Sequence, residues 1–467
     1  NMKQKKEATI GIALIPVVFL VGLLIVSLKF FGSDPHIPLF ISAMFAAVYA
    51  MQVLNFSWKE IEEGIVDTIK MSMGAIIILM VIGMVIGTWI QAGVVPAMIF
   101  YGLKVLSPSI FLIATLIICS IVSLATGSSW TTAGTVGIAL MGVGMGLGIP
   151  APMVGGAIIS GAYFGDKMSP LSDTTNLAPA MAGADLFDHI RHMIYTTGPS
   201  YIISLILFGI IGMQYAGGNL DQASIDAMLN GLSANFNITP VLLLLPLIVI
   251  GIVVMKTPAI PGLFGGALLG GVFGMIFQSA SLGDVVGALH YGFSIETGME
   301  ALDSLLNRGG MDSMMWTISL ILCAMIFGGV MEKTGMLQAI AGGILKIARS
   351  TGSLVVATIL TAILMNMGAG DQYLAIVIPG RMFKDAYDER GLHPKNLSRV
   401  LEDSATLTSP LIPWNTCGAF MIGTLGLAPW TYVPFCFLNL LNPLVSIFYG
   451  FTGITMHKVE GYEEKVA

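Results

Sequence analysis

Apolar stretches of about 20 residues recur from one end of this chain to the other, and two regions interrupt them in the same way. The first region holds residues 126–130 (TGSSW) and 169–176 (SPLSDTTN), and the second holds residues 367–372 (MGAGDQ) and 409–416 (SPLIPWNT). A stretch of about 20 apolar residues can cross a bilayer as a helix. Irregular backbone is tolerated at that depth only where protein or a watery cavity satisfies its polar groups. The paired interruptions therefore predict a binding site in the middle of a membrane protein.

The composition also indicates an all-α polytopic membrane protein. Hydrophobic residues make up 55% of the 467 residues, and charged residues only 10%, whereas an ordinary soluble domain has roughly 25% charged residues. The sequence has no basic stripe interleaved with aromatic residues, so nucleic acid is not a predicted partner. The four cysteines fall in apolar segments without a CxxC pair. No cofactor is therefore predicted.

The positions of Lys and Arg predict the orientation. Lys3, Lys5 and Lys6 precede the first apolar run, which is read as a retained helix with a cytoplasmic amino terminus. If 110–148 and 353–380 are re-entrant hairpins, ten true spans remain, and most other basic residues and the carboxyl terminus also fall on the cytoplasmic side. Counting either hairpin as a full span would put many of these charges on the other face. The fold prediction is therefore two inverted repeats, each with a re-entrant helical hairpin and a broken transmembrane helix.

This topology predicts four parts of the chain. They are N-terminal transmembrane helices over 1–70, a first inverted repeat over 71–237, connecting helices with an amphipathic stretch over 238–312, and a second inverted repeat over 313–467. Two inverted halves around a central site allow each face to open in turn, as alternating access requires. The pattern predicts a secondary active transporter. A membrane enzyme or channel is the alternative from another class, but the sequence has no HExxH, CxxC or phosphate loop, and the paired interruptions would then be unexplained.

Carboxylate, hydroxyl and amide groups gather in the interrupted segments. An ionisable residue inside a membrane segment predicts a functional site, because its burial is costly unless it is paired. A hard cation such as Na⁺ prefers oxygen ligands of these kinds. The predicted ion-binding residues are Asp173, Thr174, Thr175, Asn176, Asp371, Asp166, Asn415 and Thr416. Asp173 is the first choice, because it lies inside the motif, and Asp371 at the second hairpin tip is the next.

A single aspartate in such a site can hold either H⁺ or Na⁺ at a time. Desolvation favours its protonated form, and a bound cation favours its charged form. This competition is the minimal physical basis of an antiporter. Asp166 and Lys167 can equally be a structural pair. Asp403 is more simply interpreted as a solvated helix start near the cytoplasmic end than as a site residue.

The first interruption also predicts an anion site. A half-helix that begins near Trp130 would point its amides at the centre, and a helix start favours an anion such as a carboxylate. The predicted substrate-binding residues are Ser128, Ser129, Trp130, Asn366, Trp414 and Lys167. These donors can equally serve the protein's own backbone.

Residues 126–138 (TGSSWTTAGTVGI) and 165–176 (GDKMSPLSDTTN) resemble the NhaC family of Na⁺/H⁺ antiporters, and the similarity extends over essentially the whole chain. The resemblance implies that Asp173 and Asn176 hold Na⁺. Within that family the chain is most similar to bacterial malate/lactate exchangers, which implies exchange of malate with protons inward for lactate with Na⁺ outward. It also implies a multi-pass protein of the bacterial cell membrane. Dimers are common in the ion-transporter superfamily, so a second copy of the chain is a possible partner.

Two functions of the transporter class remain open. The first is coupled exchange of malate and protons for lactate and Na⁺, and the second is plain Na⁺/H⁺ antiport without an organic substrate. Plain exchange needs only acidic ligands, whereas an organic anion also needs donors. Because the sequence supplies both, it slightly favours the organic anion.

Overall fold

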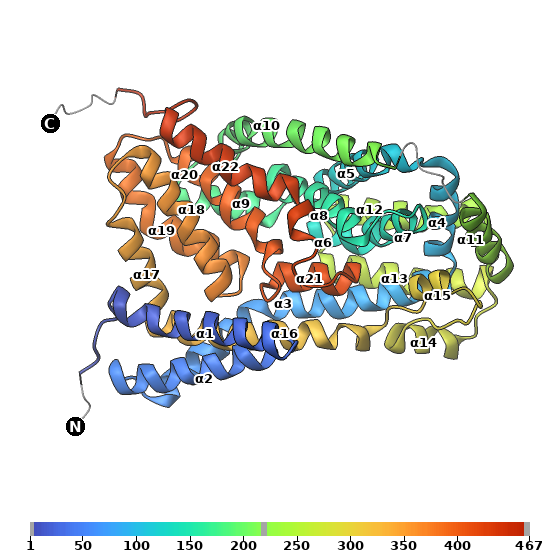
Figure 1. Ribbon diagram of the computed structural model, residues 1–467, viewed down its shortest axis with the longest axis horizontal. Helices are drawn as coiled ribbons and strands as arrows, with labels where there is room; N and C mark the ends of the chain where they lie inside the picture. Colours follow the sequence, from blue (N-terminus) through green and yellow to red (C-terminus); the bar gives the residue numbers. More distant parts are fainter. Residues whose placement is uncertain (1–3, 216–221, 462–467) are drawn as a thin grey trace.

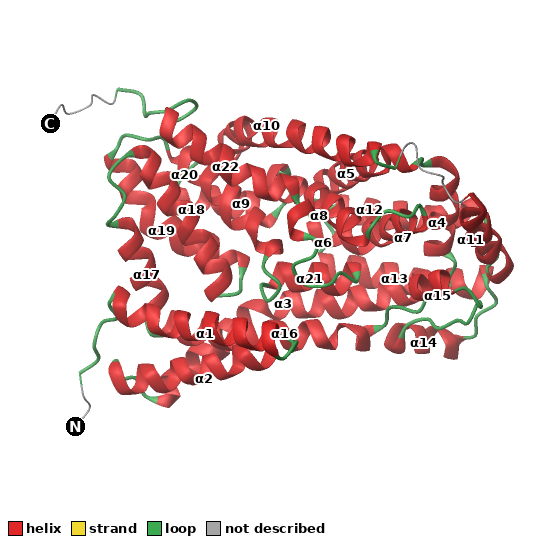
Figure 2. Cartoon of the chain, in the orientation of Figure 1, coloured by secondary structure: helices red, strands yellow, loops and turns green. Residues whose placement is uncertain are grey.

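The computed structural model describes residues 4–215 and 222–461. Lys3, which contributed to the predicted orientation, lies outside this part of the chain. The described residues are helical apart from loops and one isolated bridge between Leu392 and Lys458 (Figure 2). The predicted all-α fold is confirmed.

The helices follow one another closely along the chain (Figure 1). The amino-terminal part has α1 (Ile10–Phe30), α2 (His36–Val53) and α3 (Trp58–Gln91). Next come α4 (Val94–Val105), α5 (Pro108–Thr126), α6 (Ser129–Thr132), the π-helical turn η1 (Ala133–Gly137), α7 (Ile138–Gly146), α8 (Ala151–Met168), α9 (Asp173–Ala182) and α10 (Leu186–Met213).

The middle of the chain has α11 (Gln222–Asn235), η2 (Pro240–Leu243), α12 (Leu244–Val254), α13 (Ala259–Phe277), α14 (Leu282–Tyr291), α15 (Glu300–Leu306) and η3 (Met311–Met314). The last part has α16 (Met315–Lys333), α17 (Met336–Leu345), α18 (Thr351–Gly368), α19 (Gln372–Glu389), α20 (Pro394–Leu401), the π-helical turn η4 (Glu402–Thr406), η5 (Ser409–Leu411), α21 (Thr416–Leu425), η6 (Val433–Phe435) and α22 (Phe437–Thr452).

Eight of the described helices are long and apolar enough to cross a membrane, or nine if the bent pair Gln222–Asn235 and Pro240–Val254 is one span. The chain is therefore a multi-pass membrane protein. The sequence predicts ten spans, and part of the difference lies in helices that are short, such as the 16-residue α22. Large apolar side chains such as Val18 on α1 and Ile202 on α10 are exposed, as lipid-facing residues of a membrane protein are.

The long helix α3 packs antiparallel against α16. Gly64 of α3 lies against the Lys333 side chain at the end of α16, and Gly83 lies against Gly310, just before α16 begins. A Cβ atom on Gly83 would be 2.4 Å from the Gly310 carbonyl oxygen. The boundary predicted after residue 70 falls inside α3, which is continuous from Trp58 to Gln91. The four predicted parts remain a prediction.

Both predicted hairpins contain a reversal where the sequence has glycine. In the first, α5 ends at Thr126 and the chain turns at Gly127, whose φ is +70°. In the second, α18 ends at Gly368 and the turn includes Gly370, whose φ is +66°. Glycine adopts these left-handed angles without the steric cost that other residues meet. The two breaks that the sequence predicts inside apolar runs are therefore present.

The open ends of the two hairpins lie at opposite ends of the molecule. The first open end packs beside α4, where Gly102 meets the Val143 side chain, and the second packs beside α17, where Gly342 meets the Met382 side chain. Helices α4 and α17 stand at the right and left ends of Figure 1. Inverted repeats would produce this arrangement, and the inverted relation itself remains a prediction.

Gly127 offers a direct test of the first hairpin tip. A Cβ atom there would lie 2.7 Å from the Leu171 carbonyl carbon, whereas a Cβ atom on Gly148, with φ +79°, would meet no atom within 4 Å. We expect Gly148→Ala to lower the free energy of unfolding by about 1–2 kcal/mol through left-handed strain alone. Gly127→Ala is expected to cost about 1–3 kcal/mol more, because overpacking is added to strain. Thermal unfolding in detergent measures both variants. Equal losses of stability in the two variants would contradict the close packing of the tip against Leu171.

Candidate functional site

A cavity of about 680 Å³ lies where the two hairpin tips approach the broken helices. Its wall combines the middle of α3, the first hairpin tip, the break between α8 and α9, the connection from α12 to α13, and the start of α19. The polar residues that line it are Ser72, Thr126, Ser128, Ser129, Thr131, Asp166, Ser172, Asp173, Thr174, Lys256, Thr257, Asp371, Gln372, Tyr373 and Thr416. The cavity therefore brings together residues from both interrupted regions.

Asp166 binds the first hairpin tip to the broken helix. It lies near the end of α8 and is 9% exposed. One carboxylate oxygen accepts a hydrogen bond from the Ser129 hydroxyl at 2.5 Å, and the other accepts from the Ser129 amide at 3.3 Å and from the Ser172 hydroxyl at 3.4 Å. No Lys, Arg or His of the described chain forms an ion pair with it. A buried carboxylate that has neutral donors and no basic partner inside a membrane protein is a candidate cation site.

Asp173 and Asp371 supply two further carboxylates to the cavity wall. Asp173 lies in the first turn of α9, is exposed, and accepts a hydrogen bond from the Tyr373 hydroxyl at 3.2 Å. Asp371 is 5% exposed and is the N-cap of α19, accepting from the amides of Tyr373 at 2.7 Å and Leu374 at 3.1 Å. Capping therefore already uses one carboxylate oxygen of Asp371, Oδ1. Of the three carboxylates, Asp166 is thus the one that is hydrogen-bonded both to the first hairpin tip and to the break between α8 and α9.

Three of the predicted ion-binding residues do not line the cavity. Thr175 donates from its hydroxyl to the Asp166 carbonyl oxygen at 2.7 Å. Asn176 donates to the carbonyl oxygens of Pro170 at 2.9 Å and Ser172 at 2.7 Å. Asn415 is the N-cap of α21, where it accepts from the Cys417 amide at 3.0 Å. These side chains satisfy the backbone of the broken helices, and the other predicted ion-binding residues, Thr174 and Thr416 among them, line the cavity.

The predicted substrate-binding residues divide in the same way. Ser128, Ser129 and Trp130 line the cavity, and the Trp130 ring stacks on Phe420 with centroids 4.1 Å apart. Asn366, Trp414 and Lys167 do not line it. Asn366 donates to the Ala405 carbonyl oxygen at 2.9 Å, and the Trp414 indole donates to the Met367 carbonyl oxygen at 2.8 Å.

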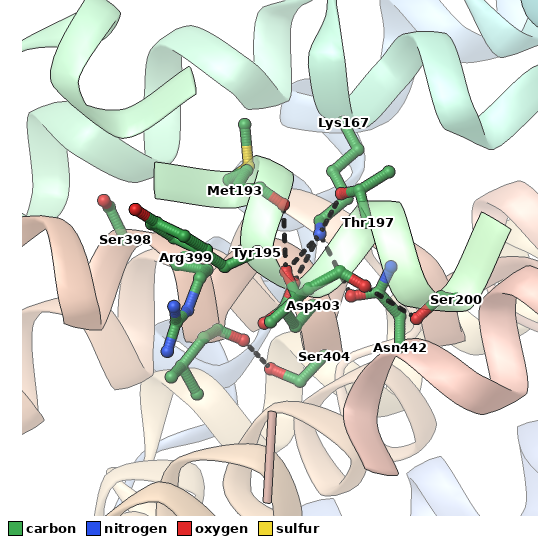
Figure 3. A network of polar contacts seen from close by, with 12 residues as sticks. Lys167, Met193, Tyr195, Thr197, Ser200, Ser398, Arg399, Asp403, Ser404 and Asn442 are labelled. Atoms are coloured by element: carbon green, nitrogen blue, oxygen red, sulfur yellow. Dashed lines mark hydrogen bonds and ion pairs between the residues drawn. The ribbon is translucent and has the colours of Figure 1, made fainter. Parts of the chain in front are cut away.

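Lys167 is fully buried behind the cavity wall, where it forms an ion pair with Asp403 (Figure 3). The Lys167 Nζ atom lies 2.5 Å from Asp403 Oδ1 and donates to the hydroxyls of Thr197 at 2.7 Å and Thr196 at 2.9 Å, and to Asn442 Oδ1 at 3.0 Å. The prediction of a solvated helix start at Asp403 is wrong, because its side chain is 0% exposed. The missed signal is Lys167 itself, since a lysine inside a membrane segment requires a partner.

Sequence reasoning also missed polar residues of the cavity wall, among them Ser72, Lys256 and Tyr373. Each lies outside the interrupted motifs, on α3, on the connection from α12 to α13, or just after the second tip. Only the packing of α3 and α13 beside the tips brings Ser72 and Lys256 to the site. Three carboxylates and one lysine ammonium therefore line the cavity.

Comparison with known proteins assigns the family. The Na⁺/H⁺ antiporter family matches residues 161–454, well over half of the chain. The chain is 42% identical over 463 residues to the Na⁺/H⁺ antiporter NhaC of Alkalihalophilus pseudofirmus, covering 99% of this chain and 100% of that protein. It is 41% identical over 418 residues to the malate-2H⁺/Na⁺-lactate antiporter of Bacillus subtilis, covering 90% and 89%. It is 37% identical over 460 residues to the arginine/ornithine antiporter ArcD of Halobacterium salinarum, covering 98% and 95%.

The resemblance of residues 126–138 and 165–176 to antiporters is thereby confirmed, and the relatives are transporters, not enzymes. The acidic cavity between two helix breaks is consistent with cation-coupled antiport, with Na⁺ and H⁺ as transported ions. The chain belongs to the Na⁺/H⁺ antiporter family.

Proposed function

We propose that Na⁺ and H⁺ are the only species that this antiporter exchanges. The observation that carries the proposal is the charge of the cavity wall, where Asp166, Asp173 and Asp371 face one basic residue, Lys256. A dicarboxylate such as malate would bring two further negative charges into this space. Like charges in a poorly hydrated site repel strongly, whereas Na⁺ or H⁺ reduces the negative charge.

Several of the donors expected to bind an organic anion are already occupied. The Ser129 hydroxyl donates to Asp166, and the Asn366 side-chain amide donates to the Ala405 carbonyl oxygen and the Thr408 hydroxyl. Lys167 is paired with Asp403 outside the cavity. The geometry therefore favours plain antiport over the malate/lactate exchange that the sequence slightly favours. Identity does not separate the two, since relatives of both kinds are equally similar, at 42% and 41%.

We infer that Na⁺ is held at Asp166, with oxygen atoms from Ser129, Ser172, Asp173 and Thr174 nearby. Carboxylate and hydroxyl oxygens suit a hard cation. A proton on Asp166 would remove the charge that attracts Na⁺, and Na⁺ would displace that proton. Exchange of one for the other on alternate faces of the membrane then follows from competition at a single carboxylate.

A cationic amino acid is the second candidate substrate. The cavity, at about 680 Å³, lies within the range of roughly 300–1,000 Å³ that small-molecule sites occupy. Its acidic wall suits a positive side chain, and the relative ArcD exchanges arginine and ornithine by its name. The same transport assay distinguishes this candidate from Na⁺ alone.

We also propose that the protein lies in the bacterial cell membrane with both termini in the cytoplasm. The start of α1 and the end of α22 lie at the same end of the molecule, at the left of Figure 1. Lys333 lies in the last turn of α16, directly before α17, which lies at that same end in Figure 1, in line with the excess of Lys and Arg in cytoplasmic loops. A homodimer remains a prediction.

The test uses purified protein in liposomes that contain a pH dye and an outward Na⁺ gradient. Malate outside, lactate inside, both, or neither are added, and arginine outside with ornithine inside forms a separate arm. We expect proton uptake at the same rate with and without the carboxylates, and no arginine uptake. Proton uptake that requires both carboxylates would overturn the proposal in favour of coupled exchange, and arginine uptake that requires ornithine would overturn it in favour of the cationic substrate.

A further inference from the structure

A third ionisable residue, Glu402, lies beside the Lys167–Asp403 pair. Glu402 begins the π-helical turn η4 and directly precedes Asp403. Its side chain is 0% exposed, and neither carboxylate oxygen has a hydrogen-bond partner within the described chain. Buried carboxyl groups are normally paired or hydrogen-bonded. The cavity mechanism does not use this residue, so its burial needs another explanation.

The lysine beside Glu402 has no donor to spare. An ammonium group has three N–H donors, and Lys167 Nζ already contacts oxygens of Asp403, Thr196, Thr197 and Asn442, all within 3.0 Å. An ionised Glu402 would be a buried negative charge without a hydrogen bond or an ion pair within the described chain. Such a charge is far more costly in a dry interior than a neutral carboxyl group. The geometry therefore favours Glu402 in its protonated form when the cavity holds no cation.

Polar atoms without hydrogen-bond partners lie on η4 and on α22, which packs against it. Within the described residues, the unpartnered buried atoms of η4 and α22 are Glu402 Oε1 and Oε2, Asp403 Oδ2, Thr406 Oγ1, Asn439 Oδ1, Asn442 Nδ2 and Ser446 Oγ. The large majority of buried side-chain polar atoms have a hydrogen-bond partner, so this concentration is unusual. π-helical turns are also rare and frequently occur at functional sites. Unpartnered hydroxyl and amide groups can reorient when a nearby carboxyl group gains or loses a proton. These surroundings therefore suit a group that changes its protonation state.

The turn η4 is connected to the cavity wall through two routes. Gln372 lines the cavity and donates to the Thr406 carbonyl oxygen at 3.2 Å and to the Ser409 hydroxyl at 3.0 Å. On α8, the neighbouring residues Asp166 and Lys167 face the cavity and the buried pair respectively. A cation at Asp166 would therefore place a positive charge close to Glu402, which favours loss of its proton.

We propose that Glu402 is a second proton-binding site of the exchange cycle, separate from the cavity, and that it releases its proton when Na⁺ occupies the cavity. The inference rests on Na⁺ as a cargo and does not require that organic substrates are absent. The ionisable residues on the elements packed against η4 include Lys167 and Asp166 on α8, Asp173 on α9, Tyr373, Arg381 and Tyr387 on α19, Arg399 on α20, and Tyr449 on α22, with Asp403 on η4 itself; α18 contributes none.

The test compares Glu402→Gln with the wild-type protein in liposomes. Glutamine has the shape of a protonated glutamate and cannot release a proton. We expect exchange of radioactive Na⁺ for Na⁺ within about twofold of the wild-type rate. The number of protons taken up per Na⁺ released should fall by about half, because Asp166 still exchanges a proton for Na⁺ and only the second proton site is removed. Asp385→Asn, an exposed carboxylate on α19, is the matched control and should leave both rates unchanged. A wild-type ratio of protons taken up to Na⁺ released in Glu402→Gln would overturn the proposal.

A second variant covers the case in which Glu402→Gln does not fold, which thermal unfolding in detergent would reveal. Glu402→Asp keeps a titratable group but shortens it by one methylene. It is expected to retain coupled proton uptake with a displaced pH midpoint, whereas a wild-type pH profile would overturn the proposal. All variants are assayed with and without malate and lactate. If the wild-type protein took up protons only when these carboxylates were present, the proposed function alone would be rejected. If Glu402→Gln kept the wild-type coupling of protons to Na⁺ under every condition, the proton site alone would be rejected.

Discussion

Replacing Asp166 with asparagine is expected to lower Na⁺-driven proton uptake at least about 100-fold, because the variant keeps the shape of the site but removes the buried charge that attracts Na⁺. Asparagine can still accept the hydrogen bond that the Ser129 hydroxyl makes to Asp166, so the first hairpin tip should keep its place. Proton uptake into liposomes under an outward Na⁺ gradient measures the loss. Thermal unfolding of the same variant shows that the fold is retained.

Asp173→Asn is the decisive comparison, because the sequence predicts Asp173 as the first choice for the ion. The structure has Asp173 exposed and hydrogen-bonded to Tyr373, so we expect a loss of only about tenfold, the scale of one hydrogen bond to a charged group. If Asp173→Asn were inactive while Asp166→Asn transported normally, the assignment of the central ligand to Asp166 would be wrong.

Removing one partner of the buried ion pair is expected to destabilise the protein strongly. In Lys167→Met, Asp403 is left buried without a cation, which should lower the free energy of unfolding by about 3–5 kcal/mol. The double variant Lys167→Met/Asp403→Leu should recover most of this loss, because well-packed apolar residues replace a buried pair with little net cost. Thermal unfolding of the two single variants and the double variant in detergent measures the coupling.

The surface pair of Arg191 and Asp188 is the matched control for this cycle. Their side chains are 77% and 47% exposed, and the closest atoms are 3.8 Å apart. Arg191→Met is expected to change stability by no more than about 1 kcal/mol, as exposed pairs do. If Lys167→Met lowered the free energy of unfolding as little as Arg191→Met, the buried pair would not stabilise the fold. Lys167 would then be available for a role in transport.

The sequence predicts the parts of this protein that depend on local chemistry. Polar, glycine-containing breaks inside apolar runs predict the reversals at Gly127 and Gly370, because only a membrane protein with a polar centre tolerates such breaks there. The same segments predict Asp166, Asp173 and Asp371 as cavity residues. The chemistry of these segments and the identity of the family could be predicted before any tertiary contact was known.

The tertiary structure decides which of the polar side chains are available to an ion. Thr174 and Thr175 are adjacent hydroxyl residues that both donate to the Asp166 carbonyl oxygen, yet Thr174 lines the cavity and Thr175 does not. Adjacent side chains on a helix point in different directions, so the packing of the broken helix decides which of them faces the cavity.

Pairing over long sequence distances also lies beyond the sequence. Lys167 and Asp403 come from opposite halves of the chain, and the run at 402–404 looks like a polar helix end. Whether such a segment is solvated or buried depends on the helices that cover it. Local patterns determined the membrane class, the helix breaks and the acidic centre of this protein. Tertiary packing alone decided which acid is buried beside the cavity, which is paired, and which is left without a partner, since burial and pairing depend on contacts between segments far apart in sequence.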